Sequence, residues 1–374
     1  MTRHILTTIL LQFALFFLFS NHIPNAAQGR NGGSGVTALT KCWEVGIEAP
    51  ALNALASDNI RVFFGTTTGS VQAIDAKTSG IIWTSELGGE IVSNLAVTDT
   101  TIYVVSNPLI SKETAASESI LRSLNKESGI TNWTARLAFS QQFVLGNSQT
   151  SIIAIALDGS LNAVGNQQGN IVWKAPSFGM ITARPSFSTH GTAFGTGNKQ
   201  VFVISNDNGR VLFKSSTGFV PTAVSNPSSK ALIVGDERGN VILLNTSTGR
   251  SGWKFKSGGG ISFVSFSNNG VLVASLDNFI YMISTSNGDV VWKRRLPGRV
   301  AAGMLVLENF VFALTYSENS AFLIDSRKGE VVDQLIRDDT NYVAQIPLLV
   351  NGWNILFTTT EGIEMHSLKW CGAK

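Results

Sequence analysis

The chain is poor in the residues on which most enzyme sites depend. Its 374 residues include two cysteines and four histidines, and only 14% of them are charged. No histidine pair has the spacing of a metal site, and no Gly-x-Ser-x-Gly motif, phosphate-binding loop or dinucleotide fingerprint occurs. The acidic pair Asp338-Asp339 is interpreted as part of a solvated loop. Enzyme classes that depend on these motifs are therefore excluded, whereas carboxylates brought together from separate loops stay open.

An excess of charge of one sign is also missing. The net charge is +3, which is too small to indicate a nucleic-acid partner, and the longest basic run is Lys293-Arg294-Arg295. Apolar residues make up 44% of the chain, so the composition is that of a folded protein. We therefore expect a partner other than nucleic acid.

Long apolar runs are missing from all but the N-terminus. Arg3 and His4 precede an apolar run over residues 5–19, and small residues follow. This order predicts a secretory signal peptide over 1–27, followed by a flexible Gly-rich linker over 28–39. The alternative is an uncleaved membrane anchor, for which a run of about 15 residues is short, since a span needs roughly 20. We expect no transmembrane span in the mature chain.

Glycine is abundant, with 36 copies, and part of it is periodic. A short apolar run, a glycine turn and usually a tryptophan recur seven times, most clearly as Ala-Ile-Asp-Ala-Lys-Thr-Ser-Gly-Ile-Ile-Trp over 73–83. The turn glycines are Gly80, Gly129, Gly169, Gly209, Gly249, Gly288 and Gly329. Their spacing is about 40 residues, except for a longer first interval, and a fixed period of this size indicates a repeat architecture.

Each repeat is expected to form four antiparallel strands. In the clearest copy, 61–64 and 71–74 are predicted strands joined by a hairpin turn, a third strand begins at 81, and 91–97 supplies the remaining one. No segment has a convincing helical period. Four-stranded units repeated around an axis predict an all-β fold, an eight-bladed β-propeller over residues 40–374.

The eighth blade is expected to combine both ends of the chain. Three C-terminal strands would be closed by an N-terminal outer strand that contains Trp43, which precedes Trp83 by one repeat. This closure leaves no open edge in the ring. It also places Cys42 and Cys371 on the two sides of one turn, which predicts a disulfide between them. Two unrelated thiols are the alternative.

The recurring features of the turn have structural interpretations. Asp75 is expected to accept hydrogen bonds from amides of its own turn, and Gly80 to take a positive φ. The tryptophans offer large apolar faces that are expected to pack between adjacent blades instead of holding a ligand. These repeat positions are Trp43, Trp83, Trp133, Trp173, Trp253 and Trp292.

The repeat over 73–83, with 62–66 before it, resembles that of pyrroloquinoline-quinone-type (PQQ-like) propellers, and 243–249 and 283–288 are related copies. The resemblance covers nearly all of residues 40–370 and implies the eight-bladed fold. This family contains quinoprotein dehydrogenases and a non-catalytic, BamB-like branch. The chain lacks the adjacent cysteine pair of many such dehydrogenases and any compact acidic motif for the roughly 6–8 oxygen ligands of Ca²⁺. The resemblance to the non-catalytic branch implies no cofactor, although the N-terminal lipid-bearing cysteine typical of that branch is absent.

A partner is expected to bind the face that carries the inter-blade loops and the loops between the second and third strands of each blade. The largest departure from the period, an insertion over 106–118, lies there, and a tolerated surface insertion is its alternative. Arginines that border inter-blade loops on this face suit carboxylate or backbone recognition. The candidate contact residues are Leu109, Ile110, Arg184, Arg299 and Arg337.

The sequence therefore predicts an exported, periplasmic or extracellular, monomeric propeller that binds a protein partner of the cell envelope without catalysis, metal or cofactor. Two alternatives stay open. A PQQ-dependent quinoprotein dehydrogenase would show PQQ- and Ca²⁺-dependent dye reduction. A carbohydrate-binding or carbohydrate-cleaving propeller would be identified by glycan binding.

Overall fold

The structure is a computed structural model that describes residues 39–47, 50–108, 118–315, 320–336, 346–369 and 371. The chain divides into two compact units, Met1–Gly35 and Val36–Lys374. The predicted signal peptide and the predicted linker up to residue 38 lie outside the described residues. Leu39, the last residue of the predicted linker, is buried against the propeller core. The part of the chain that the structure describes contains no helix that could cross a membrane.

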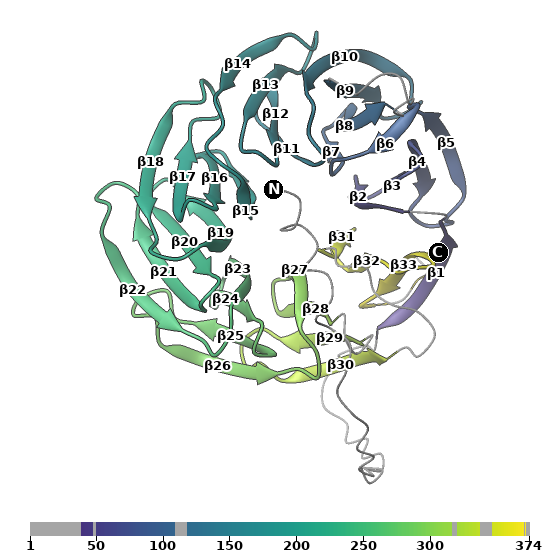
Figure 1. Ribbon diagram of the computed structural model, residues 1–374. Coiled ribbons are helices and arrows are strands. Elements are labelled where there is room, and N and C mark those ends of the chain that lie inside the picture. The colour runs from purple at the N-terminus through teal and green to yellow at the C-terminus, as the bar shows by residue number, and fades with distance from the viewer. Residues whose placement is uncertain are drawn as a thin grey trace, which may run out of the picture. The chain divides into compact units, whose positions relative to one another are not determined.

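The second unit is an eight-bladed β-propeller, as predicted (Figure 1). Each blade is an antiparallel sheet whose strands follow one another from the axis outwards. Blade I holds β2 (Pro50–Ser57), β3 (Arg61–Thr66), β4 (Ser70–Asp75) and β5 (Ile81–Glu86). Blade II holds β6 (Gly89–Ile91), β7 (Ala96–Val97), β8 (Thr101–Pro108), β9 (Glu118–Asn125) and β10 (Thr131–Ala138). Blade III holds β11 (Phe143–Asn147), β12 (Ser151–Ala156), β13 (Leu161–Gly165) and β14 (Ile171–Ala175).

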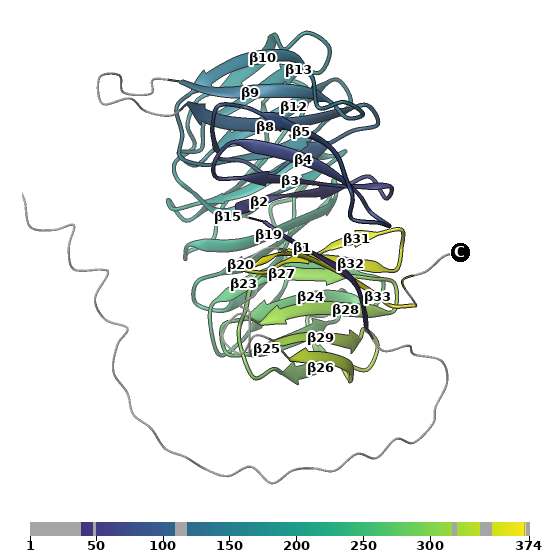
Figure 2. The same cartoon turned by 90° about the vertical axis from the view of Figure 1, so that its right-hand side faces the viewer.

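The remaining blades continue this order around the ring, which Figure 2 shows edge-on. Blade IV holds β15 (Ile181–Ser188), β16 (Gly191–Thr196), β17 (Gln200–Ile204) and β18 (Val211–Ser216). Blade V holds β19 (Pro221–Ser228), β20 (Ala231–Asp236), β21 (Asn240–Asn245) and β22 (Ser251–Lys256). Blade VI holds β23 (Ile261–Ser267), β24 (Gly270–Ser275), β25 (Phe279–Ile283) and β26 (Val290–Arg295). Blade VII holds β27 (Val300–Val306), β28 (Phe310–Thr315), β29 (Ser320–Asp325) and β30 (Val331–Ile336).

Blade VIII closes the ring with strands from both ends of the chain. It holds β31 (Leu348–Val350), β32 (Asn354–Thr358), β33 (Gly362–Ser367) and β1 (Thr40–Gly46). The N-terminal strand β1 pairs antiparallel with β33, from Thr40 opposite Ser367 to Gly46 opposite Gly362. A disulfide joins Cys42 and Cys371, whose Cα atoms lie 5.0 Å apart. The closing strand is therefore held by a backbone ladder and by one covalent bond.

The repeat tryptophans join each blade to the next. The indole Nε1 of Trp83 donates to the carbonyl oxygen of Lys126, at 3.0 Å, in the turn between the third and fourth strands of blade II. The indole face packs under the glycine of that turn, so a Cβ at Gly129 would lie 2.5 Å from the Trp83 ring. The same donation to the next blade is made by Trp43, Trp133, Trp173, Trp253 and Trp292.

The turn itself differs from the sequence expectation at one position. The Asp75 carboxylate accepts hydrogen bonds from the amides of Lys77 and Thr78, at 2.9 and 2.7 Å, as expected. The positive φ belongs to Ser79, at 59°, and not to Gly80. Ser79 donates its amide to the Asp75 carbonyl, as Gly129 does within its own turn, so Ser79 is the structural equivalent of the repeat glycine. The expectation for Gly80 was wrong because a neighbouring glycine in this copy displaced the alignment by one residue.

The Gly–Trp contact can be tested by a matched pair of substitutions. Gly129 and Gly249 occupy the same turn position with φ of 71° and 70°. A Cβ at Gly249 would meet nothing within 4 Å, because the preceding blade carries Phe213 in place of tryptophan. We expect Gly249→Ala to lower the free energy of unfolding by about 1–2 kcal/mol through left-handed backbone strain alone. Gly129→Ala should cost roughly 1–3 kcal/mol more because Trp83 must move. Urea unfolding measures both, and equal losses would contradict the packing role.

Candidate functional site

The innermost strand of blade II is interrupted, and its irregular segment joins blade III. Between β6 and β7, Ser93 forms a parallel bridge with Phe143 of β11. The Asn94 amide nitrogen donates to the carbonyl of Leu145 at 3.0 Å, and its oxygen accepts from the Leu145 amide at 2.7 Å. One side chain thus reproduces a backbone ladder between two blades. This link holds Asn94 in a fixed position on the inner wall of the ring.

A second irregularity lies in the innermost strand of blade IV. Ala183 of β15 pairs with Gly195 and Ser186 pairs with Ala193, so Arg184 and Pro185 together face a single residue of β16. This is a β-bulge, which re-aims a side chain and accommodates a proline that cannot donate to the ladder. The Arg184 side chain is exposed and lines the cavities described next.

Two cavities lie among the innermost strands. The larger, of about 470 Å³, is bounded by β6, β11, the start of β15 and the hairpin after β12. The smaller, of about 340 Å³, lies between β2, β7 and β31. Arg184 and Asn94 line both cavities. The larger volume falls in the range of small-molecule sites, roughly 300–1,000 Å³.

Arg184 is electrostatically unusual. Its guanidinium makes no hydrogen bond or ion pair with any residue that the structure describes, although Glu90 lines the same cavity. The Arg184 side chain is accessible to solvent where it lines the cavities. Protein atoms nevertheless lie close around it, and the resulting desolvation lowers the pKa of the guanidinium. An arginine stays charged at neutral pH all the same. Arg184 therefore presents a positive charge that no described residue pairs with, although the carboxylate of Glu90 lines the same cavity.

The other candidate contact residues are not gathered around Arg184. Arg299 lies exposed in the loop between β26 and β27 and lines neither cavity. Leu109, Ile110 and Arg337 lie outside the described residues. The strand order places Arg184 and Arg299 at the same end of the blades, where the inter-blade loops lie.

The same end of the blades carries exposed apolar side chains that the sequence analysis missed. Each lies in an inter-blade loop or in a hairpin between second and third strands. In the sequence each is next to glycine, serine or aspartate, and an apolar residue beside such a turn residue could have identified it as an exposed loop position. They are Phe139, Leu157, Met180, Phe219 and Leu276, and we call them the loop-face residues. Exposed apolar side chains on loops of a rigid scaffold are typical of protein contacts.

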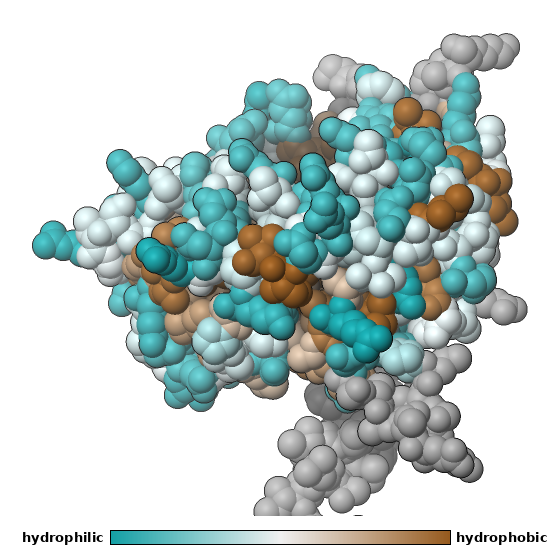
Figure 3. Space-filling view, turned by 90° about the horizontal axis from the view of Figure 1, so that it is seen from above, coloured by the Kyte–Doolittle hydropathy of each residue, from teal (hydrophilic) through white to brown (hydrophobic). Residues whose placement is uncertain are grey.

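The outer rim of the ring is also partly apolar. The outer strands begin with exposed aliphatic residues in several blades, and Figure 3, which views the ring from its rim, shows such patches separated by hydrophilic surface. These rim residues are Ile81, Ile82, Val172, Val211, Leu212, Val290, Val291, Val331 and Val332. The rim offers a matched apolar surface against which the loop face can be compared by mutation.

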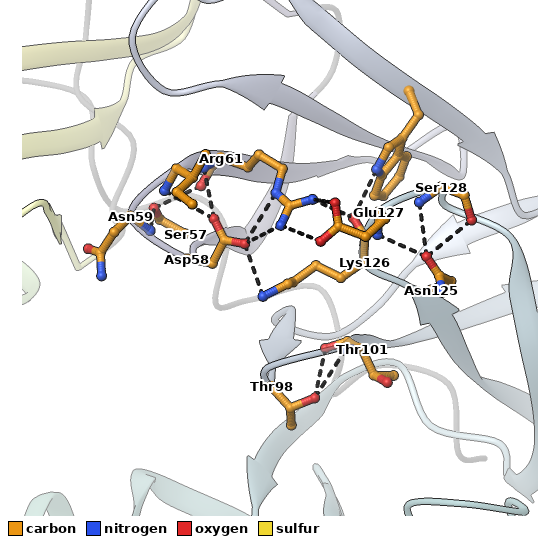
Figure 4. Close-up of polar contacts among 12 residues, drawn as sticks. Ser57, Asp58, Asn59, Arg61, Thr98, Thr101, Asn125, Lys126, Glu127 and Ser128 are labelled. Carbon is orange, nitrogen blue, oxygen red and sulfur yellow. Dashed lines mark hydrogen bonds and ion pairs between the residues drawn. The ribbon is translucent and has the colours of Figure 1, made fainter.

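The ionic cluster around Asp58 has a structural role. The Asp58 carboxylate pairs with Arg61 at 2.9 Å and with Lys126 of blade II at 3.0 Å, and Arg61 also binds Glu127 (Figure 4). Burial would raise the pKa of Asp58, but hydrogen bonds from Arg61 and Lys126 outweigh it and hold that pKa below its usual range. Asp58 and Arg61 belong to blade I, and Lys126 and Glu127 belong to blade II, so the cluster joins these two blades. None of the four residues lines either cavity.

A second buried pair lies in the closing blade. His366 Nε2 is 2.9 Å from Glu364 Oε2, and the Glu364 side chain is fully buried. Lys41 of β1 lies 3.8 Å from the other Glu364 oxygen. The contact of Lys41 with Glu364 connects the closing strand to β33, and none of the three residues lines either cavity. Among the described residues, no group of three or more His, Cys, Asp or Glu side chains could hold a metal ion.

One solved structure of low sequence identity shares this fold. The crystal structure of BamB from Moraxella catarrhalis superposes with a TM-score of 0.66 at 12% identity, over 88% of this chain and 99% of that one. The computationally designed Ika8 protein gives a TM-score of 0.49 at 15% identity, over 78% and 98%. Tetrathionate hydrolase of Acidithiobacillus ferrooxidans is 24% identical over 146 residues, which span 38% of this chain and 29% of that relative.

A family model matches far more of the chain. The model described as outer membrane protein assembly factor BamB covers residues 36–218 and 237–348, which include most of blades I–VII. The match extends through the repeat turns, the inter-blade tryptophans and the bulged strand that carries Arg184. The chain belongs to the family of outer membrane protein assembly factor BamB.

Proposed function

We propose that this protein is an exported, non-catalytic scaffold that binds a protein partner of the cell envelope during assembly of outer-membrane proteins. The observation that carries the proposal is the set of loop-face residues, which exposes apolar side chains on rigid turns at one end of the ring. Membership of the family supports the assembly role.

Blade IV offers the clearest test of the docking face. Met180 and Phe219 are 59% and 41% exposed and lie in the inter-blade loops on its two sides. Burying both against a partner would remove apolar area from water at a gain of roughly 25 cal/mol per Å². Such central apolar contacts commonly dominate the affinity of an interface.

The experiment is crosslinking and affinity capture of the mature protein from its own cell envelope. The double variant Met180→Ser/Phe219→Ser and deletion of 109–117 are each expected to reduce capture of β-barrel assembly components about tenfold or more. The control is Val211→Ser/Leu212→Ser, which removes exposed apolar residues from the rim of the same blade and should leave capture unchanged. Equal loss in test and control variants, or capture of no envelope protein by the wild type, would overturn the proposal and favour tests of quinone and glycan binding.

A further inference from the structure

The geometry of the two cavities points to a second ligand: we propose that the ring binds a small amphipathic monocarboxylate, with its carboxylate on Arg184 and its apolar body in the larger cavity. This site shares Leu157 with the loop face but takes a small molecule and not a protein partner. It would give the scaffold a small-molecule ligand.

The charge of the site selects an anion. Arg184 is unpaired within the described residues and projects from a bulge into a space shared by both cavities. A guanidinium binds a carboxylate through two parallel hydrogen bonds, and such charge-assisted bonds are the strongest available in a partly desolvated site. The desolvation that lowers the pKa of Arg184 also strengthens its attraction for an anion.

The number of charges selects a single carboxylate. Arg184 is the sole cation among the described residues that line the two cavities, and Glu90 at the larger cavity carries the opposite charge. A dianion would leave one charge uncompensated and close to Glu90. A compact inorganic anion would satisfy Arg184 but would leave the apolar wall in contact with water.

The walls of the larger cavity select an apolar body. Aliphatic side chains and the ring of Phe143 form one part of its lining, polar residues such as Gln141 and Gln142 form the rest, and about 470 Å³ is enough for a chain of several carbons. The wall is built by Ile91, Val92, Phe143, Ile155, Leu157 and Ile181. Asn94, whose amide is held by Leu145, fixes the polar end of the wall next to Arg184.

Isothermal titration of the purified mature protein with octanoate tests the site. We expect one saturable site, with binding of 1-octanol and of sulfate at least about tenfold weaker, because each lacks one of the two required features. Arg184→Gln should weaken octanoate binding about tenfold or more. Arg299→Gln, which removes an exposed arginine outside both cavities, should leave the Kd unchanged.

Several results would overturn the proposal. These are no saturable octanoate binding at millimolar concentration, sulfate or octanol binding as tightly as octanoate, or an Arg184→Gln variant that binds normally. Should Arg184→Gln fail to fold, Arg184→Lys keeps the charge without the planar fork and is expected to bind octanoate more weakly than the wild type. The Met180→Ser/Phe219→Ser variant should bind octanoate as tightly as the wild type. The titration therefore tests this site alone, and the capture experiment tests the docking proposal alone.

Discussion

Replacing Cys42 and Cys371 together by serine is expected to lower the free energy of unfolding by about 4–5 kcal/mol. The bridge spans 329 residues of sequence, so its loss releases nearly the whole described chain from a closed loop in the unfolded state. In the folded state, β1 would still pair with β33 through the backbone ladder. We therefore expect a folded but less stable ring, in which blade VIII opens first.

Urea unfolding with and without reductant measures this effect. Reduced wild type and the double serine variant should unfold at the same, lower urea concentration, and reductant should not affect the variant. Hydrogen exchange is expected to increase in β1 and β33 before the strands of blades II–VI. A reduced protein as stable as the oxidised one would show that strand pairing alone closes the ring.

Asp58→Asn is expected to destabilise the fold by about 3 kcal/mol, since it leaves two nearly buried cations without their shared carboxylate. The side chains of Arg61 and Lys126 are each only 9% exposed, and Asp58 is 10% exposed. Lys126 also belongs to the turn that accepts the Trp83 indole, so the loss affects the joint between blades I and II. Asp207→Ala, which removes an exposed carboxylate from the equivalent turn of blade IV, should change stability by less than about 0.5 kcal/mol.

The contribution of Asp58 is also expected to depend on pH. Its folded-state pKa lies below the ordinary value of about 3.9, so its stabilising effect is fully present above that pH. The effect is lost as pH falls through the folded-state pKa, where the carboxyl becomes protonated in both states. The stability difference between wild type and Asp58→Asn should therefore be constant near neutral pH and shrink below about pH 4. A difference that persists unchanged in acid would assign the loss to packing instead of charge.

The sequence by itself was sufficient for the architecture. The regular period of the turn glycines predicted four-stranded blades, and Trp43, lying one period before Trp83, predicted closure by an N-terminal strand. These features are local and repeated, so each copy supports the same interpretation. The pairing of Cys42 with Cys371 followed from the closure, because it places both chain ends at one turn.

The candidate site depended on contacts between blades, which the repeat does not encode. Arg184 and Arg299 look alike in sequence, since both lie near inter-blade loops, yet in the structure Arg184 lines two cavities and Arg299 lines neither. Arg184 lies in a bulge of the innermost strand β15, and Asn94 links the inner strand of blade II to blade III beside it, whereas Arg299 lies in a loop between blades. Period and composition determined the ring. Only tertiary packing decided that its inner wall would hold a cavity with an unpaired positive charge, because cavities form where neighbouring blades fail to pack evenly.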